Sequence, residues 1–269
     1  MGSHVRYRVT AFNTATASTN KIHDDAVAAK LGFRGGLVPG VDVYAYLCHL
    51  PAQRWGRKWL ERGTMTARFE SPVYDGDQVV IVGEPAAADG PDGPEQLELE
   101  LFDPSGARCA VARAALVVDR PPPPPQREWP SGPPPAERPK AGPETLASAR
   151  FASLEATFVA ERAGEYLDDI RETLPMFRKE RLAHPGWLLR FANSILVVNV
   201  RMGPWIHVES STHLLGLVHD EDRVETRARV TGVRERSGHR FVDLDVLQTV
   251  GGRPVARIAH TAIYQPRGT

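Results

Sequence analysis

The chain has 269 residues, enough for one large domain or two of ordinary size, and 42% of them are hydrophobic. Basic and acidic side chains number 33 each, which argues against a nucleic-acid or anionic-membrane partner. No apolar run reaches the roughly 18 residues of a membrane helix. Cys48 and Cys109 form neither a metal-binding spacing nor a disulfide framework, and the polar start lacks the apolar core of a signal peptide. We therefore expect a cytoplasmic protein.

The first half of the chain predicts a strand, two helices and then four antiparallel strands. Leu97, Leu99 and Leu101 alternate with glutamates, the pattern of a half-buried antiparallel strand. Pro51 is expected to end or kink the second helix. Helices are predicted at residues 23–31 and 41–50, and strands at residues 5–12, 63–69, 79–82, 97–101 and 107–118. This order is that of a hotdog unit, in which an antiparallel sheet wraps around one central helix.

A segment rich in proline, glycine and charge starts at residues 121–125 and runs to about residue 144. Proline removes the N–H groups that a strand needs, and little in the segment is available to bury. We expect a semi-rigid linker on the surface. The predicted boundaries are an N-terminal unit at residues 1–119, a linker at 120–146 and a C-terminal unit at 147–269.

The second half repeats the first at a nearly constant spacing, which predicts two hotdog units paired as a pseudo-dimer within one chain. Three features recur after 145 or 146 residues, namely a Pro-Gly pair, an Asp-containing turn and the turn before a final strand, at residues 39–40 and 185–186, 75–77 and 220–222, and 105–106 and 251–252. The last strand is expected at residues 255–264. The fold class is thus α+β, a double hotdog. A further dimer of such chains is an open expectation.

Residues 18–40 carry the chemistry of the first unit. A polar run with one histidine, His23, leads through a Gly-rich turn to Pro39-Gly40, where a helix is expected to begin. The N–H groups at that end of a helix lack partners and carry the positive end of its dipole. An imidazole and a helix N-terminus are the minimum parts for polarising a carbonyl and moving a proton beside it. In the second unit the corresponding residues, 164–169, contain no histidine.

This stretch resembles the signature of the MaoC-like (R)-specific enoyl-CoA hydratases, a family of hotdog-fold proteins. Their pattern is Asp-x-Asn-x-x-His, a short helix ending near Gly-Phe, and a Gly that opens the central helix. Asn20, His23 and Gly40 match the Asn, His and final Gly, and Gly32-Phe33 matches the Gly-Phe pair. Ser18 stands where the family has its catalytic Asp. The resemblance is close over residues 18–40, and elsewhere it holds only in the order of the elements.

The resemblance implies catalytic roles for four residues. His23 would transfer the proton, although a histidine at a helix start can also simply bond to a neighbouring backbone group. Asn20 would orient the imidazole or bind water, and it is equally suited to cap the short helix. The Gly40 amide would hold the thioester oxygen. A serine hydroxyl cannot act as a carboxylate base, so Ser18 is the weakest of the four.

Other polar residues have competing interpretations. Tyr44 and Tyr46 are candidate substrate-binding residues, yet they lie two positions apart on a helix and are as well suited to its core. Asp24 and Asp25 are candidates for the missing carboxylate, or they stabilise the first turn of a helix. His184 precedes the second Pro-Gly pair and is interpreted as structural or vestigial. The Asp-containing turns have no His or Cys ligands in register, so we expect neither a metal nor a cofactor.

The leading hypothesis is therefore a hydratase/dehydratase, a lyase acting on an enoyl or 3-hydroxyacyl thioester of coenzyme A or an acyl carrier protein, with a place in fatty acid or polyketide metabolism. Three alternatives stay open. They are conjugate addition of another nucleophile such as an amine, thioester hydrolysis with Asp42 as the acidic candidate, and acyl-thioester binding without catalysis. Loss of the family's Asp would cost roughly 10²–10⁴ in rate, unless another carboxylate replaces it.

Overall fold

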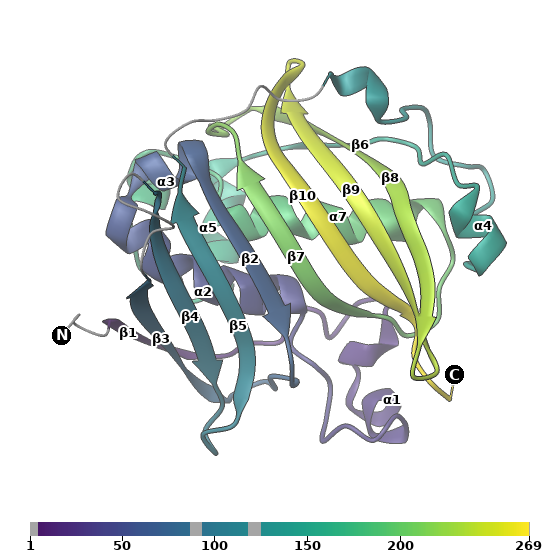
Figure 1. Ribbon diagram of the computed structural model, residues 1–269, viewed down its shortest axis with the longest axis horizontal. Coiled ribbons are helices and arrows are strands. Elements are labelled where there is room, and N and C mark those ends of the chain that lie inside the picture. The colour runs from purple at the N-terminus through teal and green to yellow at the C-terminus, as the bar shows by residue number, and fades with distance from the viewer. Residues whose placement is uncertain (1–4, 87–92, 118–124, 269) are drawn as a thin grey trace.

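The structure of the protein is a computed structural model that describes residues 5–86, 93–117 and 125–268. Within them the strands form one antiparallel sheet in the order β1-β3-β4-β5-β2-β7-β10-β9-β8-β6 (Figure 1). Its first half consists of β1 (Val5–Thr10), β2 (Gly63–Phe69), β3 (Gln78–Ala86), β4 (Glu95–Phe102) and β5 (Arg108–Leu116). Its second half consists of β6 (Leu154–Thr157), β7 (Ile206–Leu214), β8 (Arg223–Arg236), β9 (His239–Val250) and β10 (Arg253–Gln265).

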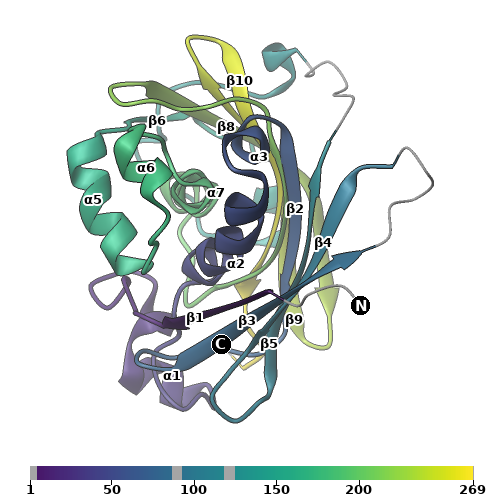
Figure 2. The ribbon, with the colours of Figure 1, turned by 90° about the vertical axis from the view of Figure 1, so that its left-hand side faces the viewer.

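Each half of the sheet curves around one long helix. The two long helices, α2 (Gly40–Trp55) and α7 (Pro185–Asn199), lie side by side in the concave face of the sheet (Figure 2). Val41 to Ala52 of α2 are all buried, as expected for a helix covered on every side. The predicted double hotdog fold is confirmed. Shorter helices are α3 (Arg57–Arg62), α4 (Pro143–Ala147), α5 (Ala160–Asp169) and α6 (Pro175–Lys179). None of the helices described is long and apolar enough to cross a membrane.

The two halves join where β2 pairs with β7. These strands run antiparallel, from Thr64 opposite His213 to Arg68 opposite Glu209. The pairing turns two five-stranded sheets into one and places the start of β7 beside the N-terminal end of α2. The two Pro-Gly pairs lie at the starts of α2 and α7, as the spacing of the repeat predicts.

Two helix predictions need correction. The segment 23–31 is divided between a 3₁₀ turn, η1 (Lys21–His23), and α1 (Asp25–Lys30), because Asn20 caps the first and Asp24 caps the second. Pro51 does not end α2, which continues to Trp55. A proline inside a helix costs about 3 kcal/mol. Burial of α2 against the sheet and α7 offsets this cost. Local sequence signals do not predict this burial.

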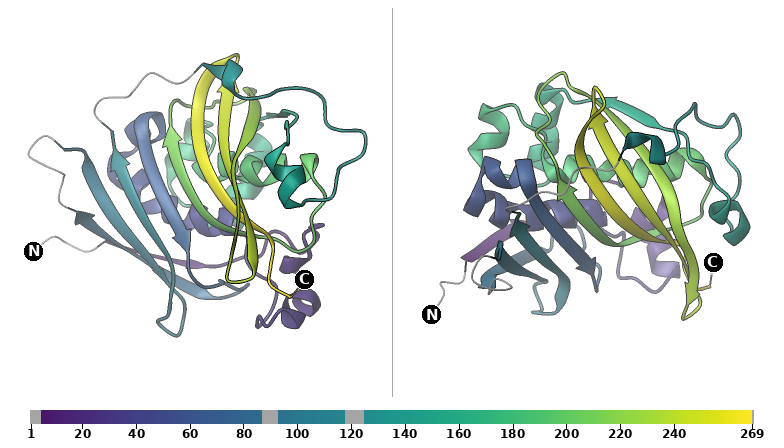
Figure 3. Two further views of the ribbon diagram at one scale, coloured as in Figure 1. Left: turned by 45° about the vertical axis from the view of Figure 1, so that its right-hand side comes forward. Right: turned by 45° about the horizontal axis from the view of Figure 1, so that its top comes forward.

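The Pro-rich segment is anchored more firmly than expected. Trp129 is only 1% exposed, and its indole N–H donates to the Asp245 carbonyl at 2.9 Å. The guanidinium groups of Arg229 and Arg257 lie 4.8 and 5.5 Å from the Trp129 ring. The segment, with its 3₁₀ turn η2 (Gln126–Glu128), therefore packs on the face of the sheet turned away from α7 (Figure 3). Met1–His4, the predicted strand end at Val118, the boundary at 119/120 and the prolines at 121–124 lie outside the described residues.

Candidate active site

A cavity of about 280 Å³ lies where the two units meet, beside the N-terminus of α2. The first unit contributes Asn20, His23 and Gly40 to its lining, and the second unit contributes residues of α7, β7 and β10. Most of the remaining wall is apolar and includes Ile22, Phe33, Val43, Phe69, Val208 and Ile263. The cavity therefore combines an apolar chamber with a few polar groups, the usual composition of a small-molecule site.

His23 is held in one orientation. Its Nδ1 atom lies 2.7 Å from the carbonyl oxygen of Leu37, which can only accept, so Nδ1 carries the proton and Nε2 is left with its lone pair. Burial lowers the pKa of His23 below its ordinary 6.5, although the Leu37 carbonyl and the charge of Asp42 oppose the shift. The imidazole is therefore neutral near pH 7, with Nε2 as its basic atom.

Asn20 links His23 to the second unit. Its amide nitrogen lies 3.4 Å from His23 Nε2 and donates to the carbonyl of Trp205 at 2.9 Å. Its amide oxygen accepts from the Trp205 N–H at 3.1 Å and from the Ile22 N–H at 3.4 Å. Asn20 thus caps η1 and also ties the site to the segment before β7. The two roles considered from the sequence, capping the turn and orienting the imidazole, coexist in one side chain.

Ser18 and the two aspartates that follow His23 do not bring a carboxylate to the cavity, within the described residues. Ser18 Oγ accepts from the Asn20 N–H at 3.1 Å, and Ser18 is absent from the cavity lining. Asp24 accepts from the Val27 N–H and caps α1, while Asp25 accepts from the Gly36 N–H at 2.7 Å and fixes the Gly-rich turn. Neither aspartate lines the cavity. All three side chains shape the loop that carries His23.

Gly40 is the first residue of α2 and lines the cavity. The amides of a helix's first turn have no intrahelical partners, so they are available to an acceptor. A Cβ atom at this position would lie 2.9 Å from Nδ1 of His207, which is closer than van der Waals contact allows. Only glycine fits between the start of α2 and this strand of the second unit.

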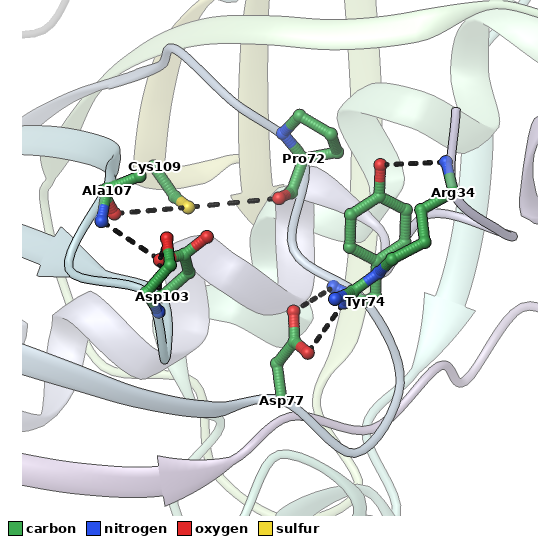
Figure 4. Close-up of polar contacts among 8 residues, drawn as sticks. Arg34, Pro72, Tyr74, Asp77, Asp103, Ala107 and Cys109 are labelled. Atoms are coloured by element: carbon green, nitrogen blue, oxygen red, sulfur yellow. Dashed lines mark hydrogen bonds and ion pairs between the residues drawn. The ribbon is translucent and has the colours of Figure 1, made fainter. Parts of the chain in front are cut away.

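The turn before α2 is braced by the segment between β2 and β3, which β5 contacts in turn. Figure 4 shows the Arg34 guanidinium bonded to Asp77 at 2.7 Å, and the Arg34 N–H donating to the Tyr74 hydroxyl at 3.2 Å. In the same view the Cys109 thiol points at the Pro72 carbonyl, 3.8 Å away. The Val38 N–H donates to the Val73 carbonyl at 2.8 Å. These bonds fix the cavity wall that leads into Gly40.

Three residues of α2 that the sequence singled out lie away from the cavity. Tyr44 is wholly buried in the core, and the Tyr46 hydroxyl accepts from the Phe12 N–H at 3.1 Å. Neither tyrosine lines the cavity, so the structure does not place them at a bound substrate. Asp42 is also wholly buried and bonds to Arg190 at 2.7 Å. It is therefore an ion-pair residue that joins α2 to α7.

The start of the central helix is packed differently in the second unit. His184 is 1% exposed, and its Nδ1 accepts from the Gly186 N–H at 3.0 Å, so it caps α7. Where Gly40 faces the cavity, Gly186 faces the Tyr166 hydroxyl and the Ala45 methyl. His184 Nε2 lies 3.5 Å from the buried carboxylate of Glu172. Within the described residues this position is filled by protein, which fits a structural role for His184.

Sequence reasoning missed the residues that the second unit supplies. His207 lies on β7, is 6% exposed and lines the cavity, and Asn193 on α7 lines it too. Neither belongs to a recognisable motif, because the second unit lacks the signature. Among the residues that the structure describes, the single carboxylate of the lining is Glu70. Hydrogen bonds from Arg108 and Arg68 lower the pKa of Glu70, so it is a poor base.

Comparison with known proteins supports the fold. No protein-family model and no curated protein matches the sequence. A solved structure described as a MaoC domain dehydratase, from Chloroflexus aurantiacus J-10-fl, is 12% identical with a TM-score of 0.65, and the match covers 100% of this chain and 96% of that one. RV0216 from Mycobacterium tuberculosis, which has a double hotdog fold, is 17% identical with a TM-score of 0.61, covering 97% and 96%.

Hotdog proteins with a different described activity match as well. A structure described as an oleoyl thioesterase, from Lactobacillus plantarum, is 10% identical with a TM-score of 0.53, covering 99% of this chain and 98% of that one. Identities this low establish the fold rather than the reaction. The chain is a double hotdog protein whose length matches structures described as MaoC-like dehydratases.

Proposed function

We propose that the protein is a hydratase/dehydratase acting on a short acyl thioester carried by coenzyme A or an acyl carrier protein. The observation that carries the proposal is the fixed tautomer of His23, whose basic Nε2 lies in the cavity that Gly40 opens onto and has only the Asn20 amide, 3.4 Å away, beside it among the described residues. At about 280 Å³ the cavity is slightly smaller than the roughly 300–1,000 Å³ of typical ligand pockets, which favours a short acyl group.

The reaction needs one proton carrier and one oxyanion donor. As the water oxygen forms its bond to C3 of the enoyl group, Nε2 of His23 takes a proton from the water, and the C2–C3 π electrons move toward the thioester oxygen. The Gly40 N–H stabilises this developing negative charge, a contribution typically of about 10²–10³ in rate. The imidazolium then returns the proton to C2. One imidazole therefore balances both transfers, and dehydration is the reverse.

Two alternatives have specific support. No carboxylate free of an arginine partner lines the cavity in the described part of the chain, so a nucleophile that needs less activation than water, such as an amine, suits the same site. Hydrolysis is described for a hotdog protein of similar fold. The acid considered for it here, Asp42, is paired with Arg190 away from the cavity, which makes hydrolysis the weaker candidate.

A cytoplasmic location accompanies the proposed activity. Cys48 and Cys109 are both buried free thiols, which fits a reducing compartment.

The test is turnover of crotonyl-CoA by the wild type, by His23→Gln and by His219→Gln, a control at an exposed histidine. Hydration removes the conjugated absorbance, hydrolysis releases free thiol, and mass analysis identifies the product. We expect the wild type to add water and His23→Gln to lose at least about a hundredfold, while His219→Gln is unchanged. Thiol release without loss of conjugation, or a fully active His23→Gln, would refute the proposal.

A further inference from the structure

Most polar groups of the cavity lining are already paired or assigned. Asn20 bonds to Trp205 and lies beside His23, whose Nδ1 bonds to Leu37. Two side chains with buried polar atoms are left over, and both come from the second unit, since Ser71 of the first unit is exposed. Nδ1 of His207 has no partner within the described residues and is covered by Gly40. The other is the amide of Asn193, which the proposed reaction does not use.

Asn193 lies in the third turn of α7 and lines the cavity. Its amide oxygen is buried and has no hydrogen-bond partner in the described part of the chain. The neighbouring side chain, Ser194, instead satisfies itself by donating to the Arg190 carbonyl at 3.1 Å. The lining of the cavity is mainly hydrocarbon and includes Val43, Phe69 and Ile263. An unpaired amide in such a wall is costly unless a ligand pairs with it.

We propose that Asn193 selects acyl thioesters whose chain carries a hydroxyl group beyond the reacting carbons. This inference rests on the proposed function, since it assumes a thioester in the same cavity. The unpaired amide oxygen can accept a hydrogen bond from a hydroxyl, and the side chain carries no charge that would attract an acid or an amine. The paired carboxylate of Glu70 at the lining likewise gives no advantage to an anionic chain.

The inference is testable because a purely apolar cavity would show the opposite binding preference. Replacing a terminal hydroxyl by a methyl group of similar size would improve binding in a hydrocarbon pocket, because the hydroxyl loses its water. In a site with an unpaired amide the same replacement removes the partner and leaves the Asn193 amide oxygen unpaired. Sites built to bond a substrate hydroxyl discriminate strongly against the analogue that lacks it.

The experiment compares matched unreactive thioesters by titration calorimetry. The pairs are 4-hydroxybutyryl-CoA with pentanoyl-CoA, and 5-hydroxypentanoyl-CoA with hexanoyl-CoA, so that the hydroxyl is placed at two depths. The proteins are the wild type, Asn193→Leu, which keeps the side-chain size, and Ser194→Ala as the control on the same helix. We expect the wild type to bind the hydroxylated member of at least one pair about tenfold more tightly, the worth of one rescued buried polar group. Ser194→Ala should keep this preference, and Asn193→Leu should abolish or reverse it.

The outcomes separate this inference from the proposed function. Tighter binding of the methyl-terminated member in both pairs, or no preference in either, overturns the role of Asn193 and leaves the thioester site intact. A preference that survives in Asn193→Leu overturns it as well. If none of the four thioesters binds to the wild type, the proposed function and the inference fail together. Circular dichroism of Asn193→Leu checks that the variant is folded. If it is not, the comparison of the two thioester pairs on the wild type still tests the inference.

Discussion

Acidification should destabilise this protein through histidines buried in the neutral form. His260 on β10 is 1% exposed, and burial lowers its pKa from 6.5 to about 3. Its Nδ1 lies 3.0 Å from the Ser210 hydroxyl, which also lies 2.7 Å from His207 Nε2. The two rings stack with their centroids 4.3 Å apart. Burial also holds the pKa of His207 well below its usual range. The pair therefore stays neutral in the folded protein while both histidines become charged in the unfolded chain.

The size of the stability loss follows from the linkage between proton binding and folding. Because the folded pKa of His260 is lowered, the unfolded chain binds more protons, and stability is lost as the pH falls from about 6.5 toward the folded pKa. At pH 5 the unfolded histidine gains about 2 kcal/mol from protonation, and the folded one gains almost nothing. The result hardly changes if the folded pKa is a unit higher. Set against a typical total stability of about 5–15 kcal/mol, this loss is readily measurable.

The assay is urea denaturation of the wild type and His260→Asn at pH 7.5 and pH 5.0. Asparagine places a polar atom near the position of Nδ1, so the contact with Ser210 can be kept while the titrating group is removed. We expect the wild type to lose about 2 kcal/mol more than the variant between the two pH values. Glu172 does not interfere, because its lowered pKa costs stability only below about pH 4.3. Equal losses in the two proteins would refute the neutral burial of His260.

Three further predictions follow from the same structure. Trp129→Ala should lower the free energy of unfolding by about 3–5 kcal/mol, and a change below 1 kcal/mol would contradict the anchoring of the Pro-rich segment. Asp42→Asn should cost about 2–3 kcal/mol in urea denaturation, less than a wholly buried pair because Arg190 keeps 30% of its side-chain exposure. It should leave crotonyl-CoA turnover by the folded protein unchanged, and a large loss would revive Asp42 as a catalytic acid. The pH profile of kcat/KM should fall only below pH 6.5, through the lowered pKa of His23, and a midpoint above 6.5 would contradict His23 as the base.

Much of the fold follows from patterns within the chain. The alternation at Leu97, Leu99 and Leu101 predicts β4, in which all three are buried. The repeat of the Pro-Gly pair predicts the starts of α2 and α7. These predictions hold because strand alternation, helix starts and turns depend on residues a few positions apart. The environments of Pro51 and Trp129 could not be predicted from local patterns, since they are formed by distant parts of the chain.

The residues of the candidate site also fall into two groups, those that the sequence predicts and those that only the structure identifies. The sequence by itself determined that Asn20, His23 and Gly40 belong to one loop and one helix start, because they lie within 21 residues of each other. Only the tertiary structure decided that His207 and Asn193 complete the cavity, and that Gly186 faces Tyr166 rather than an open chamber. The physical reason is the pairing of β2 with β7, which brings together segments some 145 residues apart. No local periodicity encodes which side chains that contact buries and which it leaves facing a ligand.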